Sequence, residues 1–260
     1  MFFRNRRLPK TRIIAVALAA TAACVSTSAL AQSMIVRSSG PSAAKYPVGK
    51  KLAANEKITL VSGDRVVLLD KGKTRTLARP GTHNSAAAVA ANQTLSSTMS
   101  QMISRDGALR RRGGATRGPG DAEVASADVR APNLWLIDAR KGGNFCVADP
   151  ATLLFWRPDI NGDTSLRVEA DGPAGKAETI AFLDGQAYRR WPGATLPLAA
   201  GSSYRLSGAG MDKPVSIRFQ LLDSLPETPD DIAAKLLERG CTAQLDRLVD
   251  TMAEDEGMAG

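Results

Sequence analysis

Apolar and polar positions alternate in short runs between residues 33 and 84, a pattern that predicts a small β module. Residues 34–36 are apolar, 57–61 alternate, and 65–69 and 74–77 each follow turn-forming residues. Short strands separated by glycine-containing turns are typical of a meander of hairpins. A module of about fifty residues buries little apolar surface alone, so we expect it to pack on another element or to dimerise.

A second β unit is predicted over residues 132–224. Short apolar runs recur there at regular spacing between turn signals, which is typical of a β-sandwich of the immunoglobulin-like kind. The clearest hairpin signal is Leu183-Asp184-Gly185-Gln186, because Asp-Gly suits a type I′ turn. The predicted strands are 134–139, 144–147, 152–157, 165–169, 178–183, 186–191, 203–206 and 215–222.

The segment 225–260 predicts a pair of helices. Thr228-Pro229-Asp230-Asp231 supplies an N-cap, a proline at the first helical position and an acidic third residue. Gly240 ends this first helix. A second amphipathic helix follows, with apolar residues spaced at three and four positions: Leu245, Leu248, Val249 and Met252.

Residues 85–131 connect the two β units and have two parts. Residues 85–105 show partial helical spacing; they offer either a methionine-rich face for a partner or, as we favour, an amphipathic helix docked on its own chain. Residues 106–131 form a glycine-rich linker with Arg110, Arg111 and Arg112. These arginines could touch an anionic lipid or polymer, but we favour a solvated flexible segment.

The first 31 residues predict a Sec-type signal peptide. A basic start, a short apolar run and small residues lead to Ala29-Leu30-Ala31, so we expect cleavage after Ala31 and release into the periplasm. Cys24 raises the alternative of a lipid anchor, which we disfavour because Thr21 stands where a lipoprotein would usually have leucine. We expect that the mature chain does not span a membrane. The predicted chain is therefore mainly β and divides into 1–31, 32–84, 85–131, 132–224 and 225–260.

Two short motifs in the first β module carry a family resemblance. The sequence pattern over about fifty residues resembles that of the periplasmic FecR-type domain. The matching motifs are Gly63-Asp64-Arg65-Val66 and Arg79-Pro80-Gly81-Thr82. The resemblance implies a β-rich extracytoplasmic module used for sensing or signalling, or as an accessory part of envelope proteins. The best-known members carry an internal membrane span and a cytoplasmic tail. This chain has a cleavable signal instead, which argues against direct transmembrane signalling.

Charge argues against nucleic acid as a partner. The full chain has a formal net charge of +8, and removing the five basic residues of the signal peptide lowers it to +3. A nucleic-acid-binding domain generally carries a strongly basic surface. We therefore predict no nucleic-acid partner.

Two cysteines remain after cleavage, Cys146 and Cys241. In an oxidising compartment such a pair favours a disulfide, with two buried free thiols as the alternative. No C-x-x-C or H-x-x-x-H spacing exists, so we predict no metal site of that kind. The stretch 159–163 is similar to a calcium loop, but Thr164 and Ala170 stand where an EF-hand needs glycine and glutamate. We predict an ordinary loop there.

Candidate catalytic residues are scarce. His83 is the only histidine, and it lies in the turn-like stretch 80–84, so we interpret it as a polar turn residue. No nucleophile elbow, P-loop or dinucleotide motif occurs. Hydrolysis by two carboxylates needs no histidine, yet nothing in the sequence pairs the aspartates. We predict no enzyme, no catalytic residue and no cofactor.

The three tryptophans all fall in the second β unit. Trp156 and Trp191, with Trp135, would either line a carbohydrate or peptidoglycan groove or, as we favour, fill the sandwich core. We therefore expect a periplasmic, non-enzymatic sensor, scaffold or accessory subunit that acts through protein–protein contacts with an envelope or inner-membrane partner. The alternative is a module that binds a glycan polymer.

Overall fold

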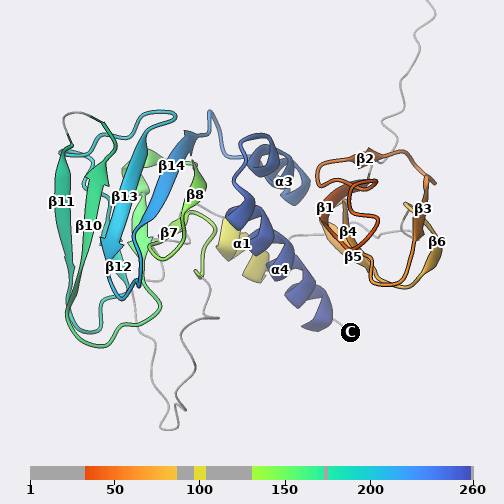
Figure 1. The fold of residues 1–260 in the computed structure, drawn as a ribbon, viewed down its shortest axis with the longest axis horizontal. Helices are drawn as coiled ribbons and strands as arrows, with labels where there is room; N and C mark the ends of the chain where they lie inside the picture. Colours follow the sequence, from red (N-terminus) through yellow and green to blue (C-terminus); the bar gives the residue numbers. More distant parts are fainter. Residues whose placement is uncertain (1–32, 87–96, 104–130, 173–174, 259–260) are drawn as a thin grey trace, which may run out of the picture.

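A computed structural model describes residues 33–86, 97–103, 131–172 and 175–258. Within these ranges the chain is mainly β, with several sheets and two C-terminal helices. Figure 1 shows the helices between the sandwich of the second β unit and the small β module. The predicted signal peptide with Cys24 and the predicted linker residues Arg110, Arg111 and Arg112 lie outside the described residues.

The small module contains every predicted strand, but their pairing differs from a meander. β1, β2, β4 and β5 form one antiparallel sheet in the order β2-β1-β4-β5, while β3 and β6 pair separately. The hairpin predicted across residues 62–64 is therefore wrong, because β3 pairs with β6 and not with β4. The strands are β1 Ser33–Ser39, β2 Lys51–Leu52, β3 Lys57–Leu60, β4 Arg65–Asp70, β5 Lys73–Leu77 and β6 Gly81–Asn84.

The four-stranded sheet of this module is buried on both faces. Along β4, Val66 and Leu68 point into the module's own core, which also holds Ile58 and Tyr46. The alternate residues, Val67 and Leu69 among them, point the other way and join a cluster formed with the helices. The expected packing partner of the module is thus the C-terminal helical pair of the same chain.

Asp64 fixes the turn between β3 and β4. Its side chain is buried although it can carry charge, so it needs hydrogen-bond donors. The backbone N–H of Val61 donates to one carboxylate oxygen at 2.7 Å, and that of Ser42 donates to the other at 2.8 Å. Gly40 lies so close that a Cβ atom there would sit 2.7 Å from the Cα of Asp64. Asp64 of the first motif therefore has a structural reason, and Gly63 before it adopts a φ of +87°, which favours glycine.

Replacing Asp64 with asparagine is expected to make the free energy of unfolding fall less steeply between pH 7 and pH 2. Hydrogen bonds from Ser42, and then from Val61, outweigh burial and hold the pKa of Asp64 below its ordinary value. A carboxyl whose pKa is lower in the folded state stabilises the fold above its unfolded pKa, and this contribution disappears as the pH falls through the folded value. Urea unfolding of both proteins between pH 7 and pH 2 should show their difference shrinking toward acid. A constant difference over this range would contradict the assignment.

Three helices are described: α1 Ser97–Ile103, α3 Pro229–Glu238 and α4 Thr242–Met258. The predicted N-cap is confirmed, because Thr228 Oγ1 accepts a hydrogen bond from the backbone N–H of Asp231 at 3.2 Å. The predicted apolar residues of the second helix are buried as expected. α4 continues to Met258. None of the helices in the described ranges has both the length and the apolar character that a membrane span needs.

The helix predicted over 85–105 is only partly described. α1 lies toward the C-terminal end of this range, and Met99, Met102 and Ile103 are buried in the cluster that α4 shares. The interpretation as a helix docked on its own chain is therefore confirmed for these residues. Ser85 and Ala86 are not helical, because Ser85 is tied into the small module by a hydrogen bond from its N–H to the carbonyl of Glu56.

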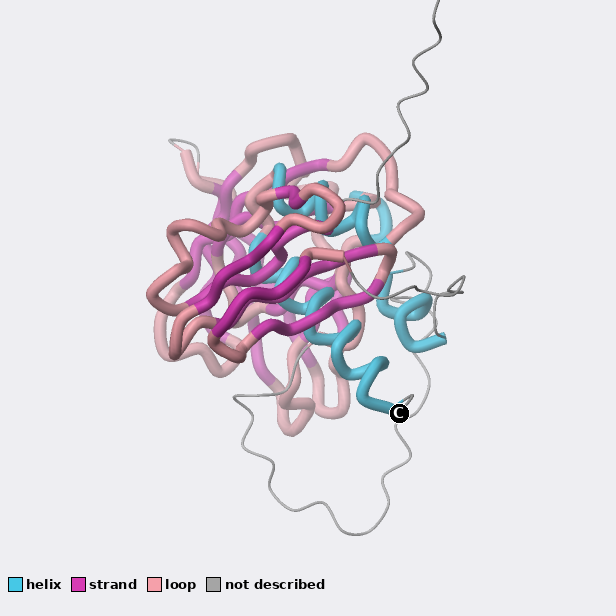
Figure 2. Tube along the Cα trace, turned by 90° about the vertical axis from the view of Figure 1, so that its right-hand side faces the viewer, coloured by secondary structure: helices cyan, strands magenta, loops and turns pink. Residues whose placement is uncertain are grey.

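The second β unit is a sandwich of two sheets. A five-stranded sheet has the order β11-β10-β13-β14-β8 and a three-stranded sheet the order β12-β9-β7. A hydrophobic core drawn from both sheets includes Phe155, Leu166 and Phe219. Figure 2 turns the molecule so that the small module's sheet comes to the front. The strands are β7 Leu136–Asp138, β8 Gly143–Val147, β9 Leu154–Trp156, β10 Thr164–Ala170, β11 Ala177–Phe182, β12 Tyr188–Arg190, β13 Ser203–Gly208 and β14 Val215–Leu221, with a 3₁₀ turn at Pro150–Thr152.

The strongest hairpin signal of the sequence turns the chain but forms no hairpin. The N–H of Gln186 donates to the carbonyl of Leu183, so a turn is present. However, β11 pairs with β10 while β12 pairs with β9, so this turn carries the chain from one sheet to the other. Buried Arg157 holds the crossing, because its guanidinium donates to the carbonyls of Leu183 and Gln186 and to those of Ile160 and Gly162.

Candidate functional site

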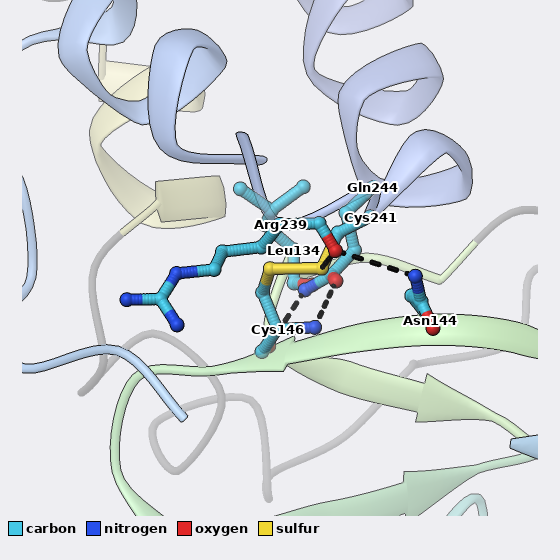
Figure 3. The surroundings of a disulfide bond; sticks show 6 residues. All are labelled: Leu134, Asn144, Cys146, Arg239, Cys241 and Gln244. Atoms are coloured by element: carbon cyan, nitrogen blue, oxygen red, sulfur yellow. Dashed lines mark hydrogen bonds between the residues drawn. A yellow bond between two sulfur atoms is a disulfide. The ribbon is translucent and has the colours of Figure 1, made fainter. Parts of the chain in front are cut away.

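A disulfide joins the sandwich to the helices. Cys146 lies in β8 and Cys241 immediately precedes α4, with an S–S distance of 2.04 Å and a Cα–Cα distance of 5.9 Å (Figure 3). The predicted bridge is confirmed, and the alternative of two free thiols is wrong. The bond fixes the start of α4 on the edge strand of the five-stranded sheet.

Gln244 completes the hydrogen bonding of that edge strand. Its side chain is 4% exposed, and its Oε1 accepts a hydrogen bond from the N–H of Cys146 at 2.7 Å. Its Nε2 donates to the carbonyl of Cys146 and to that of Leu134, both at 3.0 Å (Figure 3). The amide therefore pairs with β8 much as a neighbouring strand would. Gln244 is not among the residues predicted from the sequence, where it is one more polar residue beside the apolar positions of α4.

Replacing Gln244 with alanine is expected to destabilise the protein by about 2 kcal/mol. The change leaves buried backbone groups of Cys146 and Leu134 without their partner, and each such group costs about 1–3 kcal/mol unless water replaces it. Urea denaturation measures the loss. Gln186→Ala is the matched control, because Gln186 accepts a hydrogen bond from Leu183 at an exposed position where water can substitute. Equal losses in the two variants would contradict the role of Gln244.

The helices also hold the small module by polar contacts. Arg37 of β1 forms ion pairs with Asp246 at 3.0 Å and with Asp250 at 2.9 Å, both on α4. At the β4–β5 turn the N–H of Gly72 donates to the carboxylate of Asp230 on α3. Burial there, with smaller opposing and supporting influences, raises the pKa of Asp230 above its ordinary value. The module is thus attached to both C-terminal helices.

Close packing supports the same attachment. Gly49 has a φ of +90°, and a Cβ atom there would lie 2.4 Å from Cδ2 of Leu237 on α3. The loop before β2 therefore touches α3, and a side chain at Gly49 would have to displace that of Leu237. Together with the ion pairs and the apolar cluster, this contact holds the small module and the helices in one arrangement.

A small pocket lies beside the disulfide, between β7, β8 and the first turn of α4. Its volume of about 50 Å³ has room for a few water molecules. Three charged residues line it: Asp138, Lys141 and Arg247. Arg140 binds the carboxylate of Asp138 through Nε at 2.9 Å and a terminal nitrogen at 2.8 Å, and Arg247 donates to the carbonyl of Ala131. Two of these charges already have structural partners, so the pocket is a poor candidate for binding a metabolite.

The tryptophans proposed as a binding surface are buried. Trp156 is 5% exposed and Trp191 is 4% exposed. Trp191 packs against the rings of Phe155, Tyr204 and Phe219, and its Nε1 donates to the carbonyl of Leu196 at 2.7 Å. A glycan groove across Trp156 and Trp191 is therefore contradicted, since neither ring reaches the surface. The preferred interpretation, a sandwich core, is confirmed for Trp191 only. Trp156 packs in a separate cluster with Leu136 and Leu154, and Trp135 packs in the cluster that contains the helices, so the interpretation is wrong for these two.

The remaining candidate residues serve local structure. His83 lies in β6 and not in a turn, with Nε2 at 2.7 Å from the carbonyl of Arg79. Asp159 accepts a hydrogen bond from the N–H of Asn161, and Asp163 accepts one from Asp184, so both shape the loop. Over the described ranges no three His, Cys, Asp or Glu side chains gather where they could hold a metal ion.

Comparison with known proteins gives no relative: no family model, no curated protein and no solved structure matches this chain.

Proposed function

We propose that this chain is an exported envelope protein that acts through protein–protein contacts, as a scaffold, sensor or accessory subunit. The observation that carries the proposal is the junction between its parts. One helical pair binds the sandwich through a disulfide and Gln244, and binds the small module through ion pairs and an apolar cluster. Such a junction presents the surfaces of two β units to partners in a constant relative position.

The proposed location is the periplasm. It is supported by the signal-peptide pattern of residues 1–31 and by the disulfide, since such bonds persist mainly in oxidising compartments. The envelope partner would be an inner-membrane protein or another periplasmic protein. The immunoglobulin-like description of the sandwich is part of the same proposal, and two packed sheets support it.

The small module is the proposed partner-binding part. Its FecR-like motifs belong to the proposal, because domains of that family serve sensing in the envelope. Two large apolar side chains on its loops are exposed: Val48, with 41% of its surface accessible, and Val61, with 48%. Exposed apolar side chains next to a turn fixed by Asp64 suit a protein contact, because little ordering is needed on binding.

Site-specific cross-linking in the source cells tests the proposal. A photoreactive residue replaces Val61 in the full-length chain, and Leu183, an exposed apolar residue of the sandwich, carries it in the matched control. We expect cleavage after Ala31, an oxidised product in the periplasm and one defined envelope adduct from position 61 only. An uncleaved, reduced protein in the cytosol, or the same adducts from both positions, would overturn the proposal.

A further inference from the structure

The outer face of the five-stranded sheet carries an array of arginines. In β10, Leu166 and Val168 point into the sandwich core, so Arg167 and Glu169 point outward. The same alternation places Arg205 of β13 and Arg218 of β14 on the outer face. The helices cover this face only at β8, where Cys146 points toward α4.

Strand register places the three arginines on one diagonal. Arg167 lies opposite Ser207, which is two residues from Arg205 along β13. Arg218 lies opposite Ser203, which is two residues from Arg205 on its other side. Diagonal neighbours on one sheet face are about 7–8 Å apart. The three guanidinium groups therefore follow each other in steps that cross three strands.

These arginines make few ion pairs or hydrogen bonds within the described ranges. No ion pair or hydrogen bond within the described ranges involves the side chain of Arg205 or Arg218, and both are exposed. Glu169 lies 3.5 Å from Arg167 and directly opposite Arg205 in the register of β10 and β13. The side chains of Arg167 and Glu169 are about half exposed, so their ion pair is weak. With three arginines and one glutamate, the outer face of these strands is net positive. Its guanidinium donors are available for an anionic ligand.

The residues beside the arginines indicate which class of anionic ligand this face suits. The outward positions beside the arginines are small and mostly hydroxylated: Ser165, Thr179, Ser203, Ser207 and Ser216. Hydroxyls can bond to sugar hydroxyls, and a guanidinium can bind a carboxylate through two parallel hydrogen bonds. No outward position of β10, β11, β13 or β14 is aromatic, which disfavours stacking of bases or of neutral sugars.

We propose that this surface, the arginine face of Arg167, Arg205 and Arg218, binds a carboxylate-bearing polysaccharide. A flat face with charges in regular steps fits a polymer with repeated carboxylates better than a small molecule. The proposed site is separate from the buried tryptophans. It also goes beyond the protein contacts proposed above, because it does not involve the small module.

Binding to polygalacturonate oligomers tests the arginine face. The purified, oxidised full chain is titrated by calorimetry in low salt, beside a variant with Arg167→Gln, Arg205→Gln and Arg218→Gln. We expect affinity for polygalacturonate to fall at least tenfold in this variant and to weaken in 0.5 M salt, because exposed ion pairs are screened. A matched control, Lys57→Gln, Arg65→Gln and Arg79→Gln, removes three exposed charges from the small module and should bind like the wild type.

The outcomes separate the alternatives. Equal binding by both triple variants, or no binding of polygalacturonate by the wild type, would overturn the proposal. Equal binding of neutral dextran would also overturn it, because carboxylates would then be unnecessary. Tighter binding of single-stranded DNA than of the oligomers would assign the face to another polyanion and reject the polysaccharide. Melting temperatures of the three proteins should agree, so that loss of folding is not mistaken for loss of binding.

Discussion

Replacing Cys146 and Cys241 together with alanine is expected to lower the free energy of unfolding by about 4–5 kcal/mol. The disulfide closes a loop between residues 95 positions apart, and the chain-entropy model assigns about that value to a loop of this length. This loss would be a large part of the total stability, since a typical domain is stable by only about 5–15 kcal/mol.

Guanidinium denaturation of the double variant measures the loss of the disulfide. The single variant Cys146→Ala is the control, and it should lose about as much, because one cysteine cannot form the bond alone. Reduction of the wild type should bring its midpoint close to that of the variants. A loss under about 1 kcal/mol would show that the two cysteines contribute little beyond what the surrounding contacts already supply.

Truncating Leu69 to alanine is expected to cost about 2–5 kcal/mol. Leu69 lies in β4 with no accessible surface, in the cluster between the small module and the helices. Removing a fully buried leucine side chain loses its transfer free energy and leaves a cavity. The effect should be large because the interface that it fills connects two parts of the fold.

Urea denaturation measures the effect of Leu69→Ala. Lys57→Ala, at an exposed position of β3, is the control and should change stability by less than about 0.5 kcal/mol. Limited proteolysis adds a second readout: the Leu69 variant should be cut in the small module sooner than the wild type. A loss like that of the control would contradict the two-sided burial of β4.

Local patterns predicted the elements well and their partners poorly. Periodicity and turn residues placed most strands but missed β2 and β6, and a period of two does not say which strand is the neighbour. At 183–186 an Asp-Gly turn suggested a hairpin, yet Arg157 binds the turn carbonyls and the chain passes to the other sheet. The continuous apolar run at 66–69 is typical of a strand that is buried on both faces, because such a strand has no polar side.

Some residues that join the parts of the fold could be predicted from the sequence, and others could not. Cys146 and Cys241 were predictable, because they are the two cysteines outside the predicted signal peptide. Gln244 and Arg37 could not be found, since a polar side chain on an amphipathic element looks the same whether it binds water or another element. The diagonal of the arginine face depends on the order of β10, β13 and β14, which no local pattern reports.

Hydrogen exchange in a urea series tests the central claim most directly, that the helical pair joins both β units into one cooperative structure. The amides of β4 report the small module and those of β10 report the sandwich, whose core also holds Trp191 for fluorescence. The account predicts that β4, β10 and tryptophan fluorescence lose their folded signals at one urea concentration. Exchange of β4 at a clearly lower concentration, while β10 stays protected, would contradict it.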